Sequence, residues 1–402
     1  MDKVKKVPVL RFPGFSGEWE VKELGEEYSV LMCKRIFAEE TNENEEIPFY
    51  KIGTLGKNPD VFISRKVFEE YKSKYNYPRK GEILITCSGT VGKCIPFDGN
   101  DSYYQDSNIV WIDNPKLKIK NELLYYLFCN INWVKLNSTT ITRIYSSDLK
   151  SLVLKYPKES EEQQKIYDFI SQVDHKIERL IKKKQLLESY KKGAMQKIFS
   201  QELRFKYDNG ENYPNWGEKK LWEISSFHRG ADLSKSDIVE NGLNKCIHYG
   251  ELFTTYVEVI GKIFSYTNKD NLVKSKVGDI LMPSSDVTPQ GLAKASCIME
   301  DDVILGGDIN IIRPNDSMDS IFLSYQLNYL KYEIIKLVTG TTVKHIYFKD
   351  IKELSIKVPE LKNEQTKIAN FLTEIDNKIN HVTKQLEGTK QFKKGLLQKM
   401  FI

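Results

Sequence analysis

Cysteine and histidine are scarce in this sequence, and neither is arranged for chemistry. Of the 402 residues, six are cysteine and five are histidine. No two cysteines form a CxxC pair, their spacing matches no disulfide framework, and no two histidines stand at the spacing of metal ligands. This pattern predicts no metal site and indicates reduced thiols, so we expect a cytoplasmic protein that holds no cofactor of its own.

Long apolar runs are also missing. No run approaches the length of a membrane span, and the first six residues lead into no signal-peptide core. The hydrophobic content of 40% and charged content of 29% are typical of a soluble globular protein, and the chain is long enough for two cores. We therefore expect no membrane partner. The net charge of +5 permits a nucleic-acid partner without requiring one.

The motifs of nucleotide hydrolysis and base methylation are incomplete or missing. Residues 88–93 read SGTVGK, but a phosphate-binding P-loop needs glycine where Cys87 stands and serine or threonine where Cys94 stands. This excludes nucleotide hydrolysis at that loop. Its backbone amides and Lys93 could still face a DNA phosphate, or the segment could be a plain glycine turn. No glycine-rich S-adenosylmethionine loop and no Asn-Pro-Pro-aromatic tetrapeptide is found.

One short stretch of the sequence matches the motif of a nuclease site. Pro59-Asp60, followed by Glu70-Tyr71-Lys72, matches PD…ExK. The pattern is frequent by chance, and the second half of the chain has no counterpart. A self-sufficient nuclease or methyltransferase in the first half is therefore a weak alternative; a nuclease at this pattern would lose activity on Asp60→Ala or Glu70→Ala.

What the chain does contain is an internal repeat. Residues 190–199 read YKKGAMQKIF and residues 392–401 read FKKGLLQKMF, at an offset of 202 residues (392 − 190 = 202). The offset holds backwards without a slip to Pro157 and Pro359. Two copies of one unit are therefore the main fact about this sequence.

Each copy carries a heptad stripe of the kind that lays one helix against another. The stripes predict long helices over 161–200 and 363–402, with Ser160 and Gln163 as a candidate capping box and Asn363 as a candidate N-cap. At 1.5 Å per residue, each helix is about 60 Å long. The predicted pairing residues are Ile166, Ile170, Val173, Ile177, Leu180 and Leu187 in the first copy, and Ile368, Leu372, Ile375, Ile379, Val382 and Leu386 in the second.

Connectivity predicts that the two helices run antiparallel. The first ends where a second globular segment begins, and the second helix starts from that segment. The tripeptide Leu-Arg-Phe stands at both 10–12 and 203–205, so we expect the end of the second helix to return close to the N-terminal tripeptide. The expected divisions are a first globular domain over 1–156, a helix over 157–202, a second domain over 203–358 and a second helix over 359–402.

The globular segments repeat one scaffold but differ in one loop. Residues 19–24 match 216–221, and Gly81–Leu84 matches Gly278–Leu281, at an offset of 197 (216 − 19 = 197). Strands are expected near 82–86 and 108–112, with helices over 122–135 and 320–337. The loop after the matching strand reads TCSGTVGK over 86–93 but PSSDVTPQG over 283–291. The fold class expected is thus a tandem repeat of two mixed α/β units, separated by two long antiparallel coiled-coil helices and related by a pseudo-twofold axis.

Polar and basic residues in equivalent places are the candidate DNA contacts, because such side chains suit phosphates and base edges. A structural turn before the last strand of each unit is the alternative for the later members of each set. The candidates are Ser88, Thr90, Lys93, Thr139, Thr140, Arg143 and Tyr145 in the first unit, and Ser284, Ser285, Thr288, Gln290, Lys294, Thr341, Thr342, Lys344, His345 and Tyr347 in the second.

Several of these motifs together resemble a known family. They are EQxKI at 162–166 and 364–368, [VI]DxKI at 173–177 and 375–379, and KKGxxQKxF at the end of each copy. With residues 19–24 and Gly81–Leu84, they are similar to the specificity subunit of type I restriction-modification systems, in the right order and over nearly the whole chain.

The resemblance implies two target-recognition domains, each reading one half of a split double-stranded DNA sequence, with the helices measuring the unread spacer. It implies no catalytic site in this chain, which would be part of a DNA adenine methyltransferase and ATP-dependent endonuclease. Two modification subunits would bind S-adenosylmethionine, and restriction subunits recruited through them would use ATP and Mg²⁺. The alternative is a coiled-coil scaffold that binds proteins only and shows no salt-dependent DNA affinity.

Overall fold

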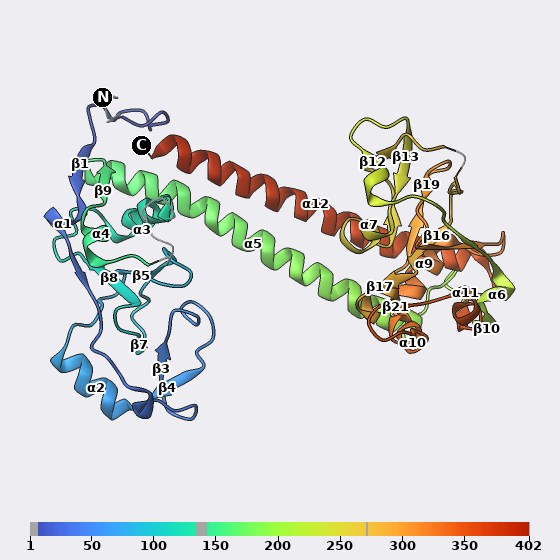
Figure 1. Cartoon of the computed structure of the whole chain (residues 1–402), viewed down its shortest axis with the longest axis horizontal. Helices are drawn as coiled ribbons and strands as arrows, with labels where there is room; N and C mark the ends of the chain where they lie inside the picture. The colour runs from blue at the N-terminus through green and yellow to red at the C-terminus, as the bar shows by residue number, and fades with distance from the viewer. Residues whose placement is uncertain (1–6, 134–142, 271, 402) are drawn as a thin grey trace. The chain divides into compact units, whose positions relative to one another are not determined.

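The chain divides into two compact units in the computed structural model (Figure 1), which describes residues 7–133, 143–270 and 272–401. The first unit joins Met1–Leu180 with Gln385–Ile402, and the second is Ile181–Lys384. Each unit therefore contains part of both long helices.

The first unit is built on an antiparallel sheet in the order β2-β8-β5-β6, with a smaller sheet β4-β3-β7 and the pair β1-β9. Its strands are β1 (Glu20–Glu23), β2 (Ser29–Leu31), β3 (Ile47–Tyr50), β4 (Val61–Ile63), β5 (Ile83–Thr86), β6 (Cys94–Pro96), β7 (Tyr103–Tyr104), β8 (Ile109–Asp113) and β9 (Val153–Tyr156). Its short helices are α1 (Leu24–Glu27), α2 (Arg65–Lys74), α3 (Asn121–Cys129) and α4 (Ser146–Lys150).

The second unit repeats this plan in a larger form, with sheets β11-β20-β16-β18-β14 and β12-β15-β13-β19 and the pairs β10-β22 and β17-β21. Its strands are β10 (Gly217–Lys220), β11 (Ser225–Arg229), β12 (Ile238–Val239), β13 (Asn244–Ile247), β14 (Val259–Ile260), β15 (Ser265–Thr267), β16 (Ile280–Pro283), β17 (Ser285–Asp286), β18 (Ser296–Ile298), β19 (Ile304–Leu305), β20 (Ile309–Pro314), β21 (Lys344–His345) and β22 (Ser355–Val358). Its short helices are α6 (Leu221–Ile224), α7 (Tyr249–Thr254), α8 (Pro289–Leu292), α9 (Ser320–Tyr329), α10 (Lys331–Lys336) and α11 (Phe348–Ile351).

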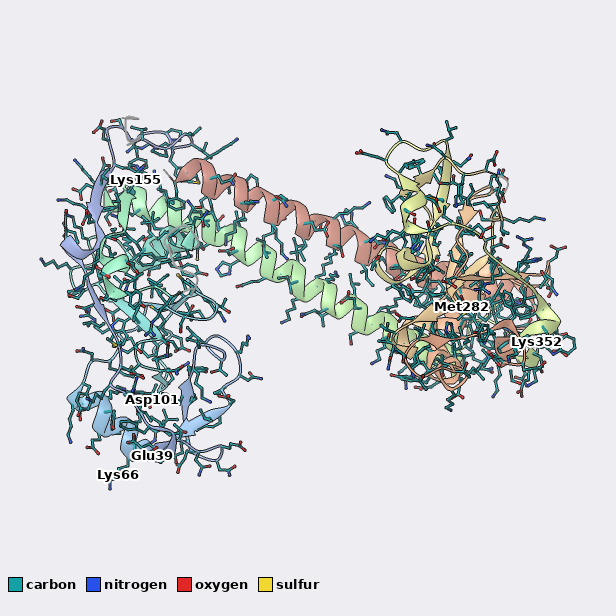
Figure 2. All side chains as sticks on the ribbon, in the orientation of Figure 1. Glu39, Lys66, Asp101, Lys155, Met282 and Lys352 are labelled. Atoms are coloured by element: carbon teal, nitrogen blue, oxygen red, sulfur yellow. The ribbon has the colours of Figure 1, made fainter. Side chains whose placement is uncertain are left out.

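The central strands are buried on both faces, which explains why the sequence shows continuous apolar runs there rather than alternation. All four residues of β5, and all four of β16, are buried. In Figure 2, Met282 of β16 lies inside the second unit, whereas Lys352 lies at its surface. The sheet β2-β8-β5 of the first unit corresponds to β11-β20-β16 of the second, so the predicted tandem repeat of mixed α/β units is confirmed.

The long helices are α5 (Ser160–Phe199) and α12 (Lys362–Met400). Within each unit, part of α5 runs antiparallel to part of α12 (Figure 1). In the first unit, Ile166 and Ile170 share an apolar cluster with Leu396 and Met400. In the second, Ile198 shares one with Ile368 and Leu372. Burial of each such aliphatic side chain contributes roughly 1.5–3 kcal/mol to the free energy of folding. This burial stabilises the two long helices, whose other faces carry many exposed lysines and glutamates.

The N-terminal segment packs against the end of α12. The Leu10 amide donates to the Lys399 carbonyl at 2.8 Å, as the Leu203 amide donates to the Lys197 carbonyl at 2.9 Å. Trp19 then packs edge-on against Phe401, as Trp216 does against Phe199, with ring centroids 6.4 Å apart in both pairs. The expected return of the second helix to the N-terminal tripeptide is confirmed.

Three local expectations about helix ends are wrong. The helix expected to reach residue 135 ends at Cys129, and that expected over 320–337 is broken at Leu330 between α9 and α10. Asn363 is not an N-cap, because α12 already begins at Lys362.

Gln163 also has another role than the expected capping box. Its side-chain amide donates to the Pro157 carbonyl at 3.0 Å and accepts from the Lys120 amide at 3.0 Å. Gln365 repeats this with Pro359 at 3.0 Å and the Asp319 amide at 2.8 Å. These glutamines tie each long helix to the entrance of a short helix. Within the described ranges, no helix is both long and apolar enough to cross a membrane.

Candidate nucleic-acid interface

The loop between β5 and β6 in the first unit is a compact turn held by Thr86. The Thr86 hydroxyl donates to the Thr90 carbonyl and accepts from the Lys93 amide at 3.0 Å. Gly92 has a φ of +78°, and an added Cβ would lie 2.2 Å from the Trp133 ring, so only glycine fits. The Lys93 ammonium donates to the Leu55 carbonyl. The expected turn is therefore present, while a phosphate contact by Lys93 or Thr90 stays a prediction.

Three candidates of the first unit lie together beside this loop. Ser88 forms a β-bridge with Arg143, and its hydroxyl donates to the Asn108 side chain at 2.6 Å. The Arg143 guanidinium lies over the ring of Tyr145, 5.6 Å from its centroid, and Tyr145 is 60% exposed. Thr139 and Thr140 lie outside the described residues.

The second unit makes the equivalent arrangement with the same serine and tyrosine, but with His345 in place of Arg143. Strand β17 pairs with β21, so that Ser285 lies opposite His345 and their side chains are 2.9 Å apart (Oγ to Nδ1). The His345 ring stacks on Tyr347 at 5.8 Å between centroids. Thr341 and Thr342 are exposed on the approach to β21, and the Lys344 ammonium donates to the Gly340 carbonyl at 2.6 Å.

The remaining candidates have other contacts. The Thr288 hydroxyl donates to Asp286 at 2.7 Å, and Gln290 lies in α8. The Lys294 ammonium points to the Phe253 carbonyl at 3.5 Å, and burial lowers the pKa of Lys294. Whether any candidate contacts DNA stays a prediction.

Two arginine–aspartate pairs beside these clusters were missed by the sequence analysis. Arg229, at the end of β11, pairs with Asp308 at 3.1 Å, and Arg35, after β2, pairs with Asp106 at 2.9 Å. Asp308 also accepts from the Ser284 hydroxyl at 3.3 Å. The repeat already aligned the two aspartates in sequence. Their arginine partners follow only from the strand pairing, because they lie 71 and 79 residues away.

Arg229 lies between two hollows of the second unit. One, of about 400 Å³, also contains Ser284, Tyr347 and Lys349 in its wall. The other, of about 880 Å³, is lined by Lys235, His248, Tyr249 and Lys269 among others. Burial lowers the pKa of His248 from its ordinary value, so His248 is neutral at pH 7 and can accept a hydrogen bond. Three aspartates, Asp232, Asp237 and Asp308, also line the larger hollow, and Lys269 and Arg229 pair with two of them. The lining is therefore polar and of mixed charge, which suits a polar ligand better than a small apolar one.

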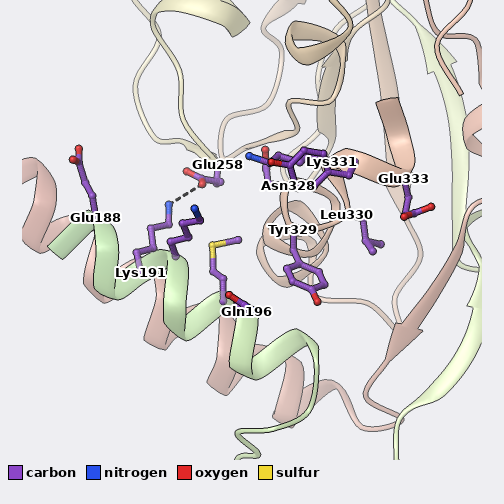
Figure 3. Close-up of a pocket in the computed structure, with 12 residues that line it drawn as sticks. Glu188, Lys191, Gln196, Glu258, Asn328, Tyr329, Leu330, Lys331 and Glu333 are labelled. Atoms are coloured by element: carbon purple, nitrogen blue, oxygen red, sulfur yellow. Dashed lines mark hydrogen bonds and ion pairs between the residues drawn. The ribbon is translucent and has the colours of Figure 1, made fainter. Parts of the chain in front are cut away.

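A third hollow of the second unit, of about 690 Å³, lies between α5 and residues 328–333 (Figure 3). The Lys191 ammonium is 2.7 Å from both Glu258 and Asp376, and the Tyr325 hydroxyl donates to Asp376 at 2.5 Å. Burial raises the pKa of Asp376.

The first unit repeats this junction, with Lys393 2.5 Å from Asp174 and the Tyr126 hydroxyl 2.8 Å from it. The charges at both junctions are paired, so the junctions hold helices together.

The residues of the PD…ExK pattern are each engaged elsewhere. Asp60 pairs with Lys51 at 3.3 Å, Glu70 with Lys74 at 2.8 Å, and Lys72 with Asp101 at 3.2 Å. Among the residues with described positions, no three His, Cys, Asp or Glu side chains are grouped to hold a metal ion. The geometry of the pattern therefore gives no support to the nuclease alternative.

Comparison with known proteins identifies the family. The chain matches the family described as "Type I restriction modification DNA specificity domain" over residues 16–189 and again over 213–388. A putative type I restriction enzyme specificity subunit of Haemophilus influenzae is 49% identical over 138 residues, which is 34% of this chain and 36% of that protein. The match to that relative thus spans about a third of its length. The type I restriction enzyme MjaVIII specificity subunit of Methanocaldococcus jannaschii is 28% identical over 98% of this chain and 94% of its own.

Solved structures show the same fold. The crystal structure of a type I restriction-modification S subunit from M. genitalium superposes with a TM-score of 0.64 at 18% identity, covering 98% of this chain and 99% of that one. A chain from a structure of the assembly and conformational transition of the type I R-M system gives a TM-score of 0.52 at 17% identity, covering 95% and 97%. None of these matches favours the alternative of a coiled-coil scaffold that binds proteins only. With the family matched twice, once in each repeat, the chain belongs to the type I restriction-modification DNA specificity family.

Proposed function

We propose that this chain is the DNA sequence-recognition subunit of a type I restriction-modification complex, and that each unit reads one half of a bipartite, gapped site. The observation that carries the proposal is the combination of a repeated scaffold with unrepeated loops. The sheets β2-β8-β5 and β11-β20-β16 correspond, but the loop after the central strand does not: it is a glycine turn in the first unit and carries β17 and α8 in the second. Beside it, His345 stands where the first unit has Arg143. Two readers of one fold with different contact residues suit two different half-sites.

The two long helices would set the length of the unread spacer and supply docking surfaces for two modification subunits. Restriction subunits would join through these. The chain itself would do no chemistry: S-adenosylmethionine, ATP and Mg²⁺ would be held by the partner subunits. In this account the chain's own contribution is the choice of the DNA sequence, through phosphate contacts that position each unit and base contacts that select.

Methylation mapping tests this function. The chain would be expressed with its neighbouring modification subunit in cells that lack other adenine methylation, and methylated adenines would be located genome-wide. We expect one motif with two specified halves around a gap of fixed length. Methylation of a single continuous motif, or an assembled complex without any motif, would contradict the proposal. A control strain that expresses the modification subunit alone should show no motif.

A further inference from the structure

We infer that Arg229 and Arg35 are specificity-determining residues, each reading a guanine in the major groove of the half-site bound by its own unit. The inference rests on the proposed function and adds to it the residues and the base class. Both arginines are exposed, with 54% of the Arg229 side chain and 58% of the Arg35 side chain accessible. Arg229 is the last residue of β11 and Arg35 follows the corresponding strand β2, and the two arginines pair with corresponding aspartates of the repeat.

The contacts of Arg229 fix the direction of its guanidinium. Nε donates to the Gly307 carbonyl at 2.9 Å, and Nη2 donates to Asp308 at 3.1 Å. These two groups lie on one edge of the planar guanidinium. The end of the fork, formed by Nη1 and the second Nη2 hydrogen, has no hydrogen-bond partner within the described part of the chain. Two parallel donors thus remain for a ligand.

The backbone beneath Arg229 is closely packed. An added Cβ at Gly230 would lie 2.0 Å from the Gly306 carbonyl oxygen, so the end of β11 and the loop before β20 are in direct contact. Asp308 is held in turn by the Ser284 hydroxyl. A side chain fixed in this way loses little conformational entropy on binding, which favours directional recognition.

The charge of the two arginine–aspartate pairs favours contact with the edge of a base over contact with a phosphate. A phosphate contact draws its affinity from an uncompensated positive charge that displaces counterions. Arg229 and Arg35 are each neutralised by an aspartate, at 3.1 and 2.9 Å, so each pair adds little to that term. Lys349, in the wall of the hollow beside Arg229, forms no ion pair with the residues that the structure describes and suits the phosphate role better. The O6 and N7 acceptors of guanine match the two parallel donors of an arginine fork.

The test uses the assembled complex of this chain with its modification subunit. Methylation rates would be measured on duplexes that carry the wild-type motif and on duplexes changed one base pair at a time in either half. The variants are Arg229→Ala, Arg229→Lys, Arg35→Ala and Arg35→Lys. Lysine keeps the charge but loses the fork, and it keeps the side chain long enough to protect folding. Arg65→Ala is the matched control, because Arg65 is 52% exposed and pairs with Glu46 and Asp101.

We expect both Arg229 variants to lose roughly tenfold to a hundredfold of the preference for one G·C pair in one half-site, with the other half unchanged. The Arg35 variants should do the same in the other half, and Arg65→Ala should change neither. A different result would overturn the inference: the alanine variants lose methylation rate equally on all duplexes, their rates depend less steeply on salt, and the lysine variants restore that salt dependence. Such a result would identify phosphate contacts. Unchanged preferences, or a wild-type half-site without a G·C pair, would also overturn the inference.

The inference can fail while the proposed function stands. A gapped motif in the wild-type complex with preferences unaltered by the variants removes only the inference. No gapped motif in the wild type removes both. Thermal unfolding of each variant, and its assembly with the modification subunit, would show that the unit is intact.

Discussion

A buried glutamate meets an arginine near the start of each long helix, but the two pairs differ. Arg11 contacts Glu162 through two hydrogen bonds of 2.7 and 2.8 Å, and Glu162 is 1% exposed. In the second unit, Arg204 approaches Glu364 only to 3.8 Å. Within the described residues, Arg204 Nε and Glu364 Oε2 are buried without a hydrogen-bond partner. Burial accordingly raises the pKa of Glu364.

Replacing each glutamate by glutamine should therefore lower the free energy of unfolding by unequal amounts. Glu162→Gln breaks a buried bidentate pair and should lower the free energy of unfolding of the first unit by about 3 kcal/mol. Glu364→Gln keeps an acceptor for the Trp216 indole and removes a poorly solvated charge, so its cost at pH 7 should be near zero. Denaturant unfolding of each variant measures this, and equal losses at the two positions would contradict the account.

The pH dependence at Glu364 follows from the direction of its shift. Because the folded-state pKa is raised above the ordinary value of 4.5, its contribution to stability is full below that value and is lost as the pH rises through the folded-state pKa. The free energy of unfolding of wild type should therefore fall relative to Glu364→Gln across this window. A constant difference between pH 4 and 7 would show that the carboxyl is not perturbed.

The loop beside the candidate contacts of the first unit depends on one glycine. Gly92→Ala would place a Cβ against the Trp133 ring at a φ of +78°, and should lower the free energy of unfolding by at least about 2 kcal/mol. Gly53→Ala is the matched control, because a Cβ there meets nothing within 4 Å and its φ is not positive. Thermal unfolding of both variants gives the comparison. Equal melting temperatures would mean that the loop does not need the glycine conformation.

At the scale of the element, the long helices followed from the sequence because their apolar stripes have a helical period over many turns. The ends of shorter helices did not follow, because tertiary contacts decide them. Residues of α10 continue the helical pattern of α9, yet the chain turns at Leu330, where it lines the hollow beside α5. The two glutamines that join helices through Pro157 and Pro359 could not be assigned from the sequence either, because their partners lie on other elements.

Matched changes of helix length should alter the spacer. Deleting one heptad at Leu180 of α5 and another at its repeat counterpart, Val382 of α12, removes about 10 Å from each helix, which corresponds to about three base pairs. Both residues are buried. We expect the methylated motif to keep its two halves and to shorten its gap. Deleting the heptad in one helix only should prevent assembly, since the stripes would no longer match. An unchanged gap in the double variant would refute the role proposed for the helices.

At the scale of the whole molecule, the repeat made the architecture predictable. Two offsets, 197 and 202 residues, align the strands and the helices of the two copies in the sequence alone. The grouping of the candidate contact residues was predictable only in part. Ser88 and Arg143, like Ser285 and His345, stood in matching places of the repeat and do lie together. Nothing in the sequence distinguished Arg35 and Arg229 from other arginines. The aspartate that orients each of them lies 71 or 79 residues away and is brought close only by the fold.

The exchange of one unit tests the central claim most directly. Residues 206–358 would be replaced by the corresponding segment of a family member with a different site, and methylation would be mapped as for the wild type. We predict that one half of the motif changes to that of the donor, while the other half and the gap stay as they were. A change in both halves, or in neither, would contradict the claim that each unit reads its own half-site.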